Sequence, residues 1–361
     1  MRRLQALRRG QQGQALVFCV LMLAALLGIA SLVVDGGNAL LQRRNQQGVA
    51  DASAMAAVKE LPASTSAADS IARDYATTRN SGDSSTVDQV VVTGATTGSC
   101  DGGFGATTLA PASVCVVVHT TITGAFSRLL GLDVWTANAR AIAQASQVTA
   151  LSAWLPFGVR SKAFTSEPPT QLTITPGNKS QNSGGMVNAP AGPDCKFYGG
   201  NQVADVIKSA AHGGADACPI SIGQEIQTQT GVSDGNITNK GFDERIGTNT
   251  DSFSDVFGQD TNGDYYVKKA DSPRLGLIPI AEDKNGKWPL AGNANISVLG
   301  YVLVYIGNTT QPPNYPAYSG KGNGLTIYLT PVNAPLPDGW TAELGDYSAT
   351  NPSPIVYRLI S

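Results

Sequence analysis

Hydrophobic and polar positions divide the chain into regions with different patterns. Residues 15–34 form an unbroken, uncharged run of 20 residues. Residues 35–149 carry helix-like and then strand-like patterns, and from residue 150 short apolar runs are separated by Gly, Asn, Pro and Asp. These patterns predict an α+β protein. We expect a transmembrane helix that continues as a stalk helix, a small α/β module, and then a larger β-rich domain.

The apolar run has the length and flanks of a membrane helix. As a helix, 20 residues extend about 30 Å, enough to cross the hydrocarbon core of a bilayer. Four arginines and no acidic residue precede it: Arg2, Arg3, Arg8 and Arg9. The positive-inside rule then predicts that residues 1–14 are a cytoplasmic basic segment, that 15–34 span the membrane, and that the rest lies outside.

Retention or cleavage of this segment is a separate question. Small residues at Gly28 and Ala30 suit a signal peptidase cutting before Ser31, but the run exceeds the 7–15 apolar residues usual in a signal peptide. Helix-compatible sequence also continues from Gly37 to Pro62. This continuity favours a retained anchor with a stalk helix over residues 35–62, and a cleaved signal peptide is the alternative.

The remaining chain is predicted as two folded parts. In the module, residues 63–149, the pattern indicates a helix at 66–79, strands at 87–94 and 113–123 joined by a loop, a short helix at 125–132 and a strand at 134–148. In the β-rich domain, residues 150–361, the run 296–307 is apolar on both faces and is expected to be a central strand. The one good helix there is expected at 203–214. The other strand-like runs are at 154–159, 171–178, 275–280, 325–332 and 354–360.

The composition of the chain excludes some classes of function. Charged residues make up 14% of the chain and the net charge is −2, which gives no basic surface for nucleic acid. Four cysteines lie beyond the span, and an even number in an exported chain predicts two disulfides. We expect neighbours to pair, although four cysteines allow three pairings. The expected pairs are Cys100–Cys115 and Cys195–Cys218.

Known catalytic motifs are missing from the sequence. It has no G-x-S-x-G, H-E-x-x-H or G-x-x-x-x-G-K-[ST] pattern, no C-x-x-C pair, and two histidines. His119 falls in a predicted strand and His212 at a helix end, where structural roles suffice. We therefore expect no enzyme, no zinc site and no small-molecule substrate, although carboxylates brought together by the fold would escape a sequence search.

One loop resembles a calcium site. Residues 260–271 place oxygen ligands at positions 1, 3, 5, 7 and 12 of a twelve-residue loop. Against this reading, position 6 lacks its Gly and position 12 is Asp rather than Glu. An ordinary Asn-Gly turn is the alternative. The ligands would be Asp260, Asn262, Asp264, Tyr266 (through its carbonyl) and Asp271.

Residues 13–57 resemble the N-terminal segment of the TadE/TadG-like group of Flp-type (tight-adherence) pilus-assembly proteins. The resemblance implies a single-pass protein of the bacterial cytoplasmic membrane with a pilin-like module and no enzymatic activity. It also implies that the helix contacts the bilayer and other pilus-assembly proteins. The helix residues that carry the match are Gly13, Asp35, Gln46, Ala50, Asp51 and Ala54.

Two departures limit the resemblance. A prepilin leader would carry Glu at the fifth position after the processed glycine, where this chain has Phe18 after Gly13 or Ala15 after Gly10. The D-x-S-x-S metal motif of adhesion-type members is absent as well. The resemblance therefore does not imply cleavage by a prepilin peptidase.

The stalk helix also carries its own physical expectations. Small residues at 50, 52, 54, 56 and 57 would allow partner helices to approach closely. Asp35, just past the span, can be hydrated; if it were buried among helices it would need a cation such as Arg43 or Arg44. Three functions remain after these considerations: a structural component of pilus assembly, a secreted binding protein or adhesin with a cleaved signal peptide, and an exported hydrolase.

Overall fold

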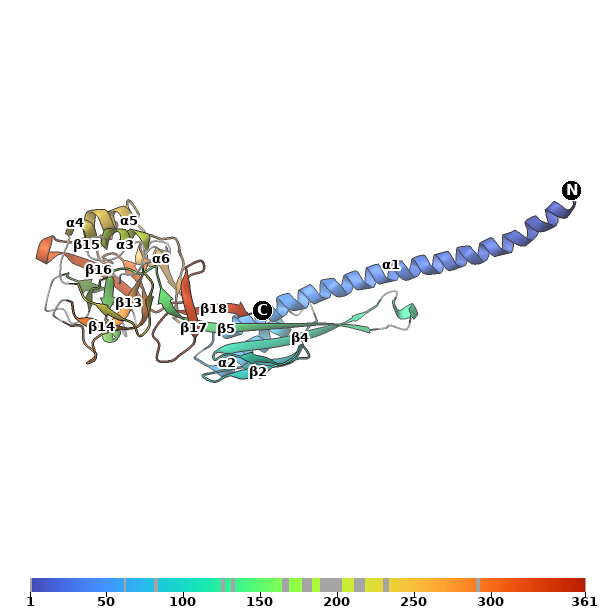
Figure 1. The fold of residues 1–361 in the computed structure, drawn as a ribbon, viewed down its shortest axis with the longest axis horizontal. Coiled ribbons are helices and arrows are strands. Elements are labelled where there is room, and N and C mark those ends of the chain that lie inside the picture. The colour runs from blue at the N-terminus through green and yellow to red at the C-terminus, as the bar shows by residue number, and fades with distance from the viewer. Residues whose placement is uncertain are drawn as a thin grey trace. The chain divides into compact units, whose positions relative to one another are not determined.

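The structure is a computed structural model of the 361-residue chain. It describes residues 2–61, 63–80, 84–124, 127–130, 134–163, 169–176, 184–188, 203–210, 218–229, 234–289 and 293–360. Two compact units share these residues: unit 1 is formed by residues 1–144 and 358–361, and unit 2 by 145–357 (Figure 1).

Unit 1 begins with one long helix, α1 (Arg2–Val58). It contains a window of mean hydropathy 2.9, none of which is buried, and so is long and apolar enough to cross a membrane. Neither Gly36 nor Gly37 interrupts it, and the predicted span and stalk are a single element (Figure 1). The helix ends at Val58, four residues before the proline that would have stopped it.

Three antiparallel strands in the order β1-β4-β5 form the sheet of unit 1: β1 (Thr86–Val92), β4 (Ser113–Thr123) and β5 (Val134–Leu151). The outer half of α1 packs on β4, and α2 (Thr65–Asp74) and a π-helical turn at Tyr75–Arg79 pack on α1 and β1. Ser64 caps α2 by accepting a hydrogen bond from the Ala67 N–H.

A disulfide-linked hairpin covers the opposite face of β4. The segment expected to be a plain loop forms a hairpin, β2 (Gly98–Cys100) with β3 (Thr107–Leu109), and Cys100 is joined to Cys115 of β4. Cys115 and Val117 pack under the hairpin, so alternation along the strand leaves Val114, Val116 and Val118 for the helices. This double cover explains why β4 is buried on both faces. The short helix expected at 125–132 is a 3₁₀ turn, Ser127–Leu130.

A large sheet organises unit 2. Its strands follow the order β15-β16-β14-β13-β6-β8, with β10 on β14 and β7 on β16. The central strand expected at 296–307 is β14 (Asn295–Ile306), which pairs with β13 (Leu275–Glu282) and β16 (Thr326–Val332). The shorter strands are β6 (Phe157–Val159), β7 (Leu172–Ile174), β8 (Gly184–Met186), β10 (Glu225–Gln227) and β15 (Tyr318–Ser319).

Further strands lie beside the end of β5 or form a hairpin. Ser146–Leu151 of β5 pair with β17 (Ala342–Asp346), and the last two of these residues pair with β9 (Ile220–Ser221). The last strand, β18 (Ile355–Ile360), also pairs with β5. The separate hairpin consists of β11 (Phe257–Gln259) and β12 (Tyr265–Val267).

Unit 2 contains more helix than its sequence indicated. The expected helix is present as α3 (Val203–Ser209). A second helical segment runs through α4 (Asp234–Ile237), a π-helix (Thr238–Asp243) and α5 (Glu244–Ile246), followed by α6 (Phe253–Val256). The prediction of a single helix was therefore wrong, because Gly235 and Gly241 break the helical pattern in the sequence. Short 3₁₀ turns complete the described elements: Ser161–Ala163 and Gly322–Gly324.

Arg245 of α5 connects the helical segment to the sheet. Its side chain is buried and donates to three carbonyl oxygens, of Pro273 at 2.8 Å, Ile207 at 2.6 Å and Leu275 at 2.6 Å. Burial lowers the pKa of Arg245 to about 9. Three charge-assisted hydrogen bonds to main-chain carbonyls compensate for the lost hydration of the guanidinium.

We predict that Arg245→Ala destabilises unit 2 by about 3–5 kcal/mol, because three buried carbonyls lose their donor. Thermal unfolding of the full chain in detergent, followed by tryptophan fluorescence, measures the loss, since Trp154, Trp288 and Trp340 report on this unit. Lys240→Ala, at an exposed position of the same segment, is the control and leaves the transition unchanged. Equal transition temperatures for the two variants would contradict the prediction.

Candidate functional site

The candidate site is the outer half of α1 and the surfaces of unit 1 around it. One face of this half, the inner stripe, packs against the unit's own sheet and α2, and none of its side chains exceeds 2% exposure. Ala-sized side chains at 50, 54 and 57 let the helix approach the valines of β4 closely. The inner stripe consists of Val49, Ala50, Ala54, Ala57 and Val58.

This packing corrects the expectation that the small residues receive partner helices. Ala50, Ala54 and Ala57 are fully buried within unit 1, and Gln46 beside them is also fully buried. The physical reason is the phase of the helix: spacings of three and four residues place 50, 54 and 57 on one face. Ala52 lies on the other side and is exposed.

The exposed face is a second line of residues, the outer stripe. Spacings of three and four residues again place its members on one side of α1. Leu41 is 56% exposed, and a Cβ added at Gly48 would meet no atom within 4 Å. A helix interior normally disfavours Gly by about 1 kcal/mol relative to Ala, and nothing within unit 1 requires it here. The outer stripe consists of Gly37, Leu41, Arg44, Gly48 and Ala52.

Asp35 is buried rather than hydrated. Its side chain is 6% exposed, and its Oδ2 accepts a hydrogen bond of 2.6 Å from the backbone N–H of Ser127. Trp135 at the start of β5 donates its Nε1–H to the Ser127 Oγ at 3.1 Å. The expectation of a hydrated carboxylate was therefore wrong, and the partner described is a main-chain N–H rather than Arg43 or Arg44. The bond ties the far end of the β4–β5 hairpin to α1 just past the apolar run.

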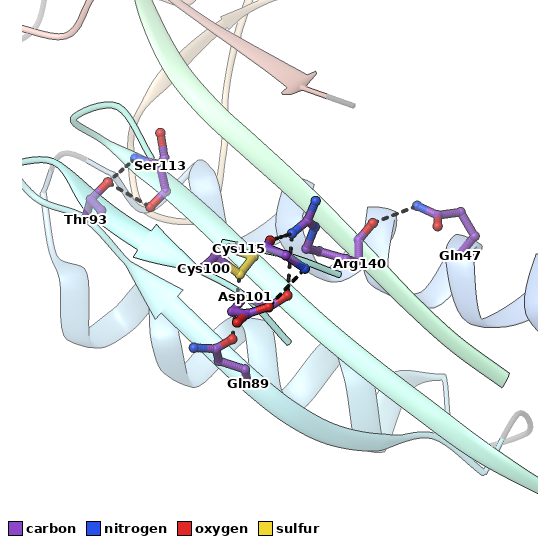
Figure 2. Close-up of a disulfide and its surroundings, with 9 residues drawn as sticks. Gln47, Gln89, Thr93, Cys100, Asp101, Ser113, Cys115 and Arg140 are labelled. Atoms are coloured by element: carbon purple, nitrogen blue, oxygen red, sulfur yellow. Dashed lines mark hydrogen bonds between the residues drawn. A yellow bond between two sulfur atoms is a disulfide. The ribbon is translucent and has the colours of Figure 1, made fainter. Parts of the chain in front are cut away.

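Further along α1, Gln47 bonds to both the helix and the sheet. Its Nε2 donates to Asp51 Oδ1 at 2.8 Å. It also donates to the Arg140 carbonyl of β5 at 3.2 Å, a contact drawn in Figure 2. The Arg140 guanidinium donates in turn to the Gly105 carbonyl at 2.9 Å, in the turn between β2 and β3. Figure 2 shows the Cys100–Cys115 disulfide beside this arginine, so polar contacts run from the helix across β5 to the disulfide-linked hairpin.

A groove of about 740 Å³ opens between α1 and the start of β5. One wall is a line of helix residues from Val33 to Arg43. The other wall is Trp135–Asn138 of β5, with Phe104 from the turn between β2 and β3. The helix residues that line it are Val33, Gly36, Gly37, Ala39, Leu40 and Arg43.

The suggested calcium loop lies in the β11–β12 hairpin. Asp260 Oδ1 accepts the backbone N–H groups of Asn262 at 2.8 Å and of Asp264 at 2.9 Å, as in an Asx turn. Gly263 takes φ +92°, the conformation that an Asn-Gly turn needs. Tyr266 is in β12 opposite Gly258, and Asp271 follows the hairpin. The turn thus forms from protein contacts, and calcium binding by these residues stays a prediction.

Other candidate chemistry is sparse in the part of the chain that the structure describes. No group of three or more His, Cys, Asp and Glu side chains is arranged to hold a metal there. His119 contacts Asp88 through Nδ1 at 2.6 Å across the β1–β4 pair. Cys195, Pro62 and His212 fall outside the described residues, and so the Cys195–Cys218 pairing stays a prediction. Gly13 lies in α1.

Unit 2 has a pocket of about 390 Å³ with Arg274 in its wall. All five N–H groups of this guanidinium have protein acceptors, which include the carbonyls of Asn249, Ile306 and Asn314. Nearby, burial favours the neutral form of Asp251, but hydrogen bonds from Lys269, Asn249 and Ser272 prevail and lower its pKa. These charged groups stabilise the loops, and the bonds of Arg274 already use every N–H of its guanidinium.

Sequence patterns did not identify Ser127, Trp135, Phe104 or Arg140 as parts of the site. Their partners lie far away in the chain; Ser127 and Asp35 are 92 positions apart. The only available signal was chemical: an acidic residue directly after an apolar run needs a donor unless water reaches it.

We predict that Asp35→Ala loosens the end of the β4–β5 hairpin, because the buried Ser127 N–H loses an acceptor at a cost of about 1–3 kcal/mol. Hydrogen exchange of the detergent-solubilised full chain should become faster in peptides covering residues 124–135. Asp35→Asn keeps an acceptor oxygen and should change exchange less. Asn38→Ala, at an exposed position of the same helix, is the control. Unchanged exchange in Asp35→Ala would show that the contact carries no stability.

The calcium prediction is tested with two variants of Asp260. Asp260→Asn keeps the turn, since Asn also forms Asx turns, but removes the charge that calcium needs. Asp260→Ala removes both and should lower the stability of the hairpin without calcium. Titration calorimetry of the full chain should give a heat of calcium binding that is absent from Asp260→Asn. If the unmodified chain gives no heat of calcium binding, these residues form an Asn-Gly turn and do not bind calcium.

Comparisons with known proteins bear on the N-terminal part of the chain. No curated protein and no solved structure matches this chain. A family model does match, over residues 13–69, which cover the apolar run, the outer half of α1 and the start of α2. The family is described as "Putative Flp pilus-assembly TadE/G-like", and the N-terminal segment of this chain is similar to it over those residues.

Proposed function

We propose that the protein is a non-enzymatic, membrane-anchored component of Flp/Tad-type pilus assembly, with its N-terminus in the cytoplasm and both units outside. The observation that carries the proposal is the match over residues 13–69, which spans the apolar helix and its continuation. In the structure these parts are one uninterrupted helix, and the inner stripe of its outer half is part of the core of unit 1. The family match and the fold therefore concern the same element.

Charge and exposure support the anchor. The side chains described between Leu16 and Ala30 are almost all exposed, and Leu16, Phe18 and Met22 are each more than 60% exposed. An apolar surface of this length is stable only against lipid or other apolar helices. Four arginines precede it, which supports a cytoplasmic N-terminus.

The outer stripe supports contact with partner proteins. The inner stripe is used within the unit, so a partner helix would dock on the other side of α1, where Gly48 and Ala52 permit close approach. The partners would be other pilus-assembly proteins with an apolar helix of their own. We infer that the module is pilin-like because the inner face of its long helix packs on its own sheet while the outer face of that helix is exposed.

The alternative is a secreted binding protein whose signal peptide is cleaved before Ser31. The inner stripe begins well beyond that point, so unit 1 would keep its core after cleavage. The state of the N-terminus must therefore be measured. Mass spectrometry of the protein from its own membranes should find a chain that retains residues 1–30 and resists carbonate extraction. A mature chain beginning at Ser31 would establish the secreted alternative.

We predict that Gly48→Leu prevents co-purification with sheared pili or with the assembly complex, because its side chain occupies the space of a partner helix. The thermal stability of unit 1 should not fall, since a Cβ there meets no neighbour within 4 Å and Leu favours helix over Gly.

Gly48→Ala, which also favours helix, is the matched variant and should keep co-purification closer to the unmodified protein. Ser70→Leu, at an exposed position of α2, controls for added hydrophobic surface. Full co-purification of Gly48→Leu would exclude the outer stripe as the docking face.

A further inference from the structure

The groove between α1 and the start of β5 lies where the helix leaves the membrane. Val33, at its inner end, belongs to the apolar run, and Arg43, at its outer end, is ten residues further along the helix. At 1.5 Å per residue these positions are about 15 Å apart. The groove is therefore continuous with the surface of the span and extends through the depth of a headgroup layer.

Both walls of the groove carry exposed apolar side chains near its membrane end. Val33 and Leu40 are 67% and 65% exposed, and Val134, next to Trp135 of the facing wall, is 63% exposed. Apolar side chains this exposed are costly in water, although single ones occur on any surface. Trp135 contributes an aromatic ring with a polar edge, the kind of side chain enriched where bilayers meet water.

Charge in the groove has one sign. Among the described residues that line it, Arg43 is charged and none is acidic. Helical side chains lean toward the N-terminus, so Arg43 leans back toward the bilayer. A long basic side chain in this position extends its charge to the headgroup layer while its methylene groups cover apolar surface. A ligand that fits this groove should therefore be apolar at its membrane end and anionic at the end beside Arg43.

We propose that this groove binds a phospholipid of the outer leaflet, with its phosphate at Arg43, its glycerol backbone beside Leu40, and the upper part of an acyl chain against Trp135 and Val33. The inference rests on the proposed function, because it needs α1 to cross the membrane. A second copy of α1 fits less well: the apolar run that would fill the groove has no acidic residue to face Arg43. The Asp35–Ser127 bond holds the two walls together at the membrane end.

The lipid contact is tested by fluorescence quenching. The full chain is reconstituted into phosphatidylcholine vesicles whose acyl chains are brominated close to the headgroup, since bromine quenches tryptophan on contact. Trp135 is the one tryptophan of unit 1, and the three in unit 2 are buried. We expect a quenched component that disappears in Trp135→Phe and is strongly reduced in Leu40→Asn.

Two controls define specificity. Leu41→Asn changes a neighbouring exposed leucine outside the groove, 56% exposed against 65% for Leu40, and should keep the quenched component. Adding brominated phosphatidylglycerol should increase quenching in the unmodified chain, and Arg43→Gln should lose that preference while remaining in the membrane.

The outcomes separate this inference from the proposed function. Quenching that is the same with and without Trp135, in a chain that resists carbonate extraction, overturns the lipid site but leaves the anchor. Efficient disulfide cross-linking of Leu40→Cys between copies, in a Cys19→Ser background, overturns it in favour of a second copy. A chain released by carbonate overturns the anchor itself.

Discussion

The close packing of α1 on β4 is the contact on which unit 1 depends. Three alanines on the inner stripe, at 50, 54 and 57, are fully buried, and the strand beneath them presents Val114, Val116 and Val118. The disulfide-linked hairpin covers the other face of the same strand, where a Cβ at Gly102 would come within 2.5 Å of Val117. Because interiors are close-packed, a larger residue in either layer would push the helix or the hairpin off the sheet.

Apolar periodicity was sufficient to predict the main elements of this unit. The run at 113–123 became β4 with those bounds, and the run from 134 became the first part of β5. Periodicity also gave the continuity of α1, but not which side of it faces inward, because small residues occur on both sides. Ala52 and Ala54 are two positions apart, and one is exposed while the other is buried. Only the position of the sheet distinguishes them.

The polar contacts could not be predicted, for a different reason. Ser127 for Asp35, the Arg140 carbonyl for Gln47 and three carbonyls for Arg245 are main-chain partners or distant residues. Every residue offers a carbonyl, so such contacts leave no motif in the sequence. The helical segment at 234–246 was missed similarly, because Gly235 and Gly241 break its pattern while Ile237, Phe242 and Arg245 are held by tertiary contacts.

In the proposed arrangement, Asp35 also restricts how deep the helix lies in the membrane. Moving α1 inward by one turn, about 5.4 Å, would carry a buried carboxylate and the tied hairpin end into hydrocarbon, where charged groups cost several kcal/mol. Moving it outward by one turn would transfer Val33 and Val34 to water, at about 1.5–3 kcal/mol for each valine fully exposed. Arg43 resists the inward movement as well, since its charge would follow Asp35 toward the hydrocarbon. The depth of the anchor and the position of unit 1 on the membrane surface would thus be set by the same few residues.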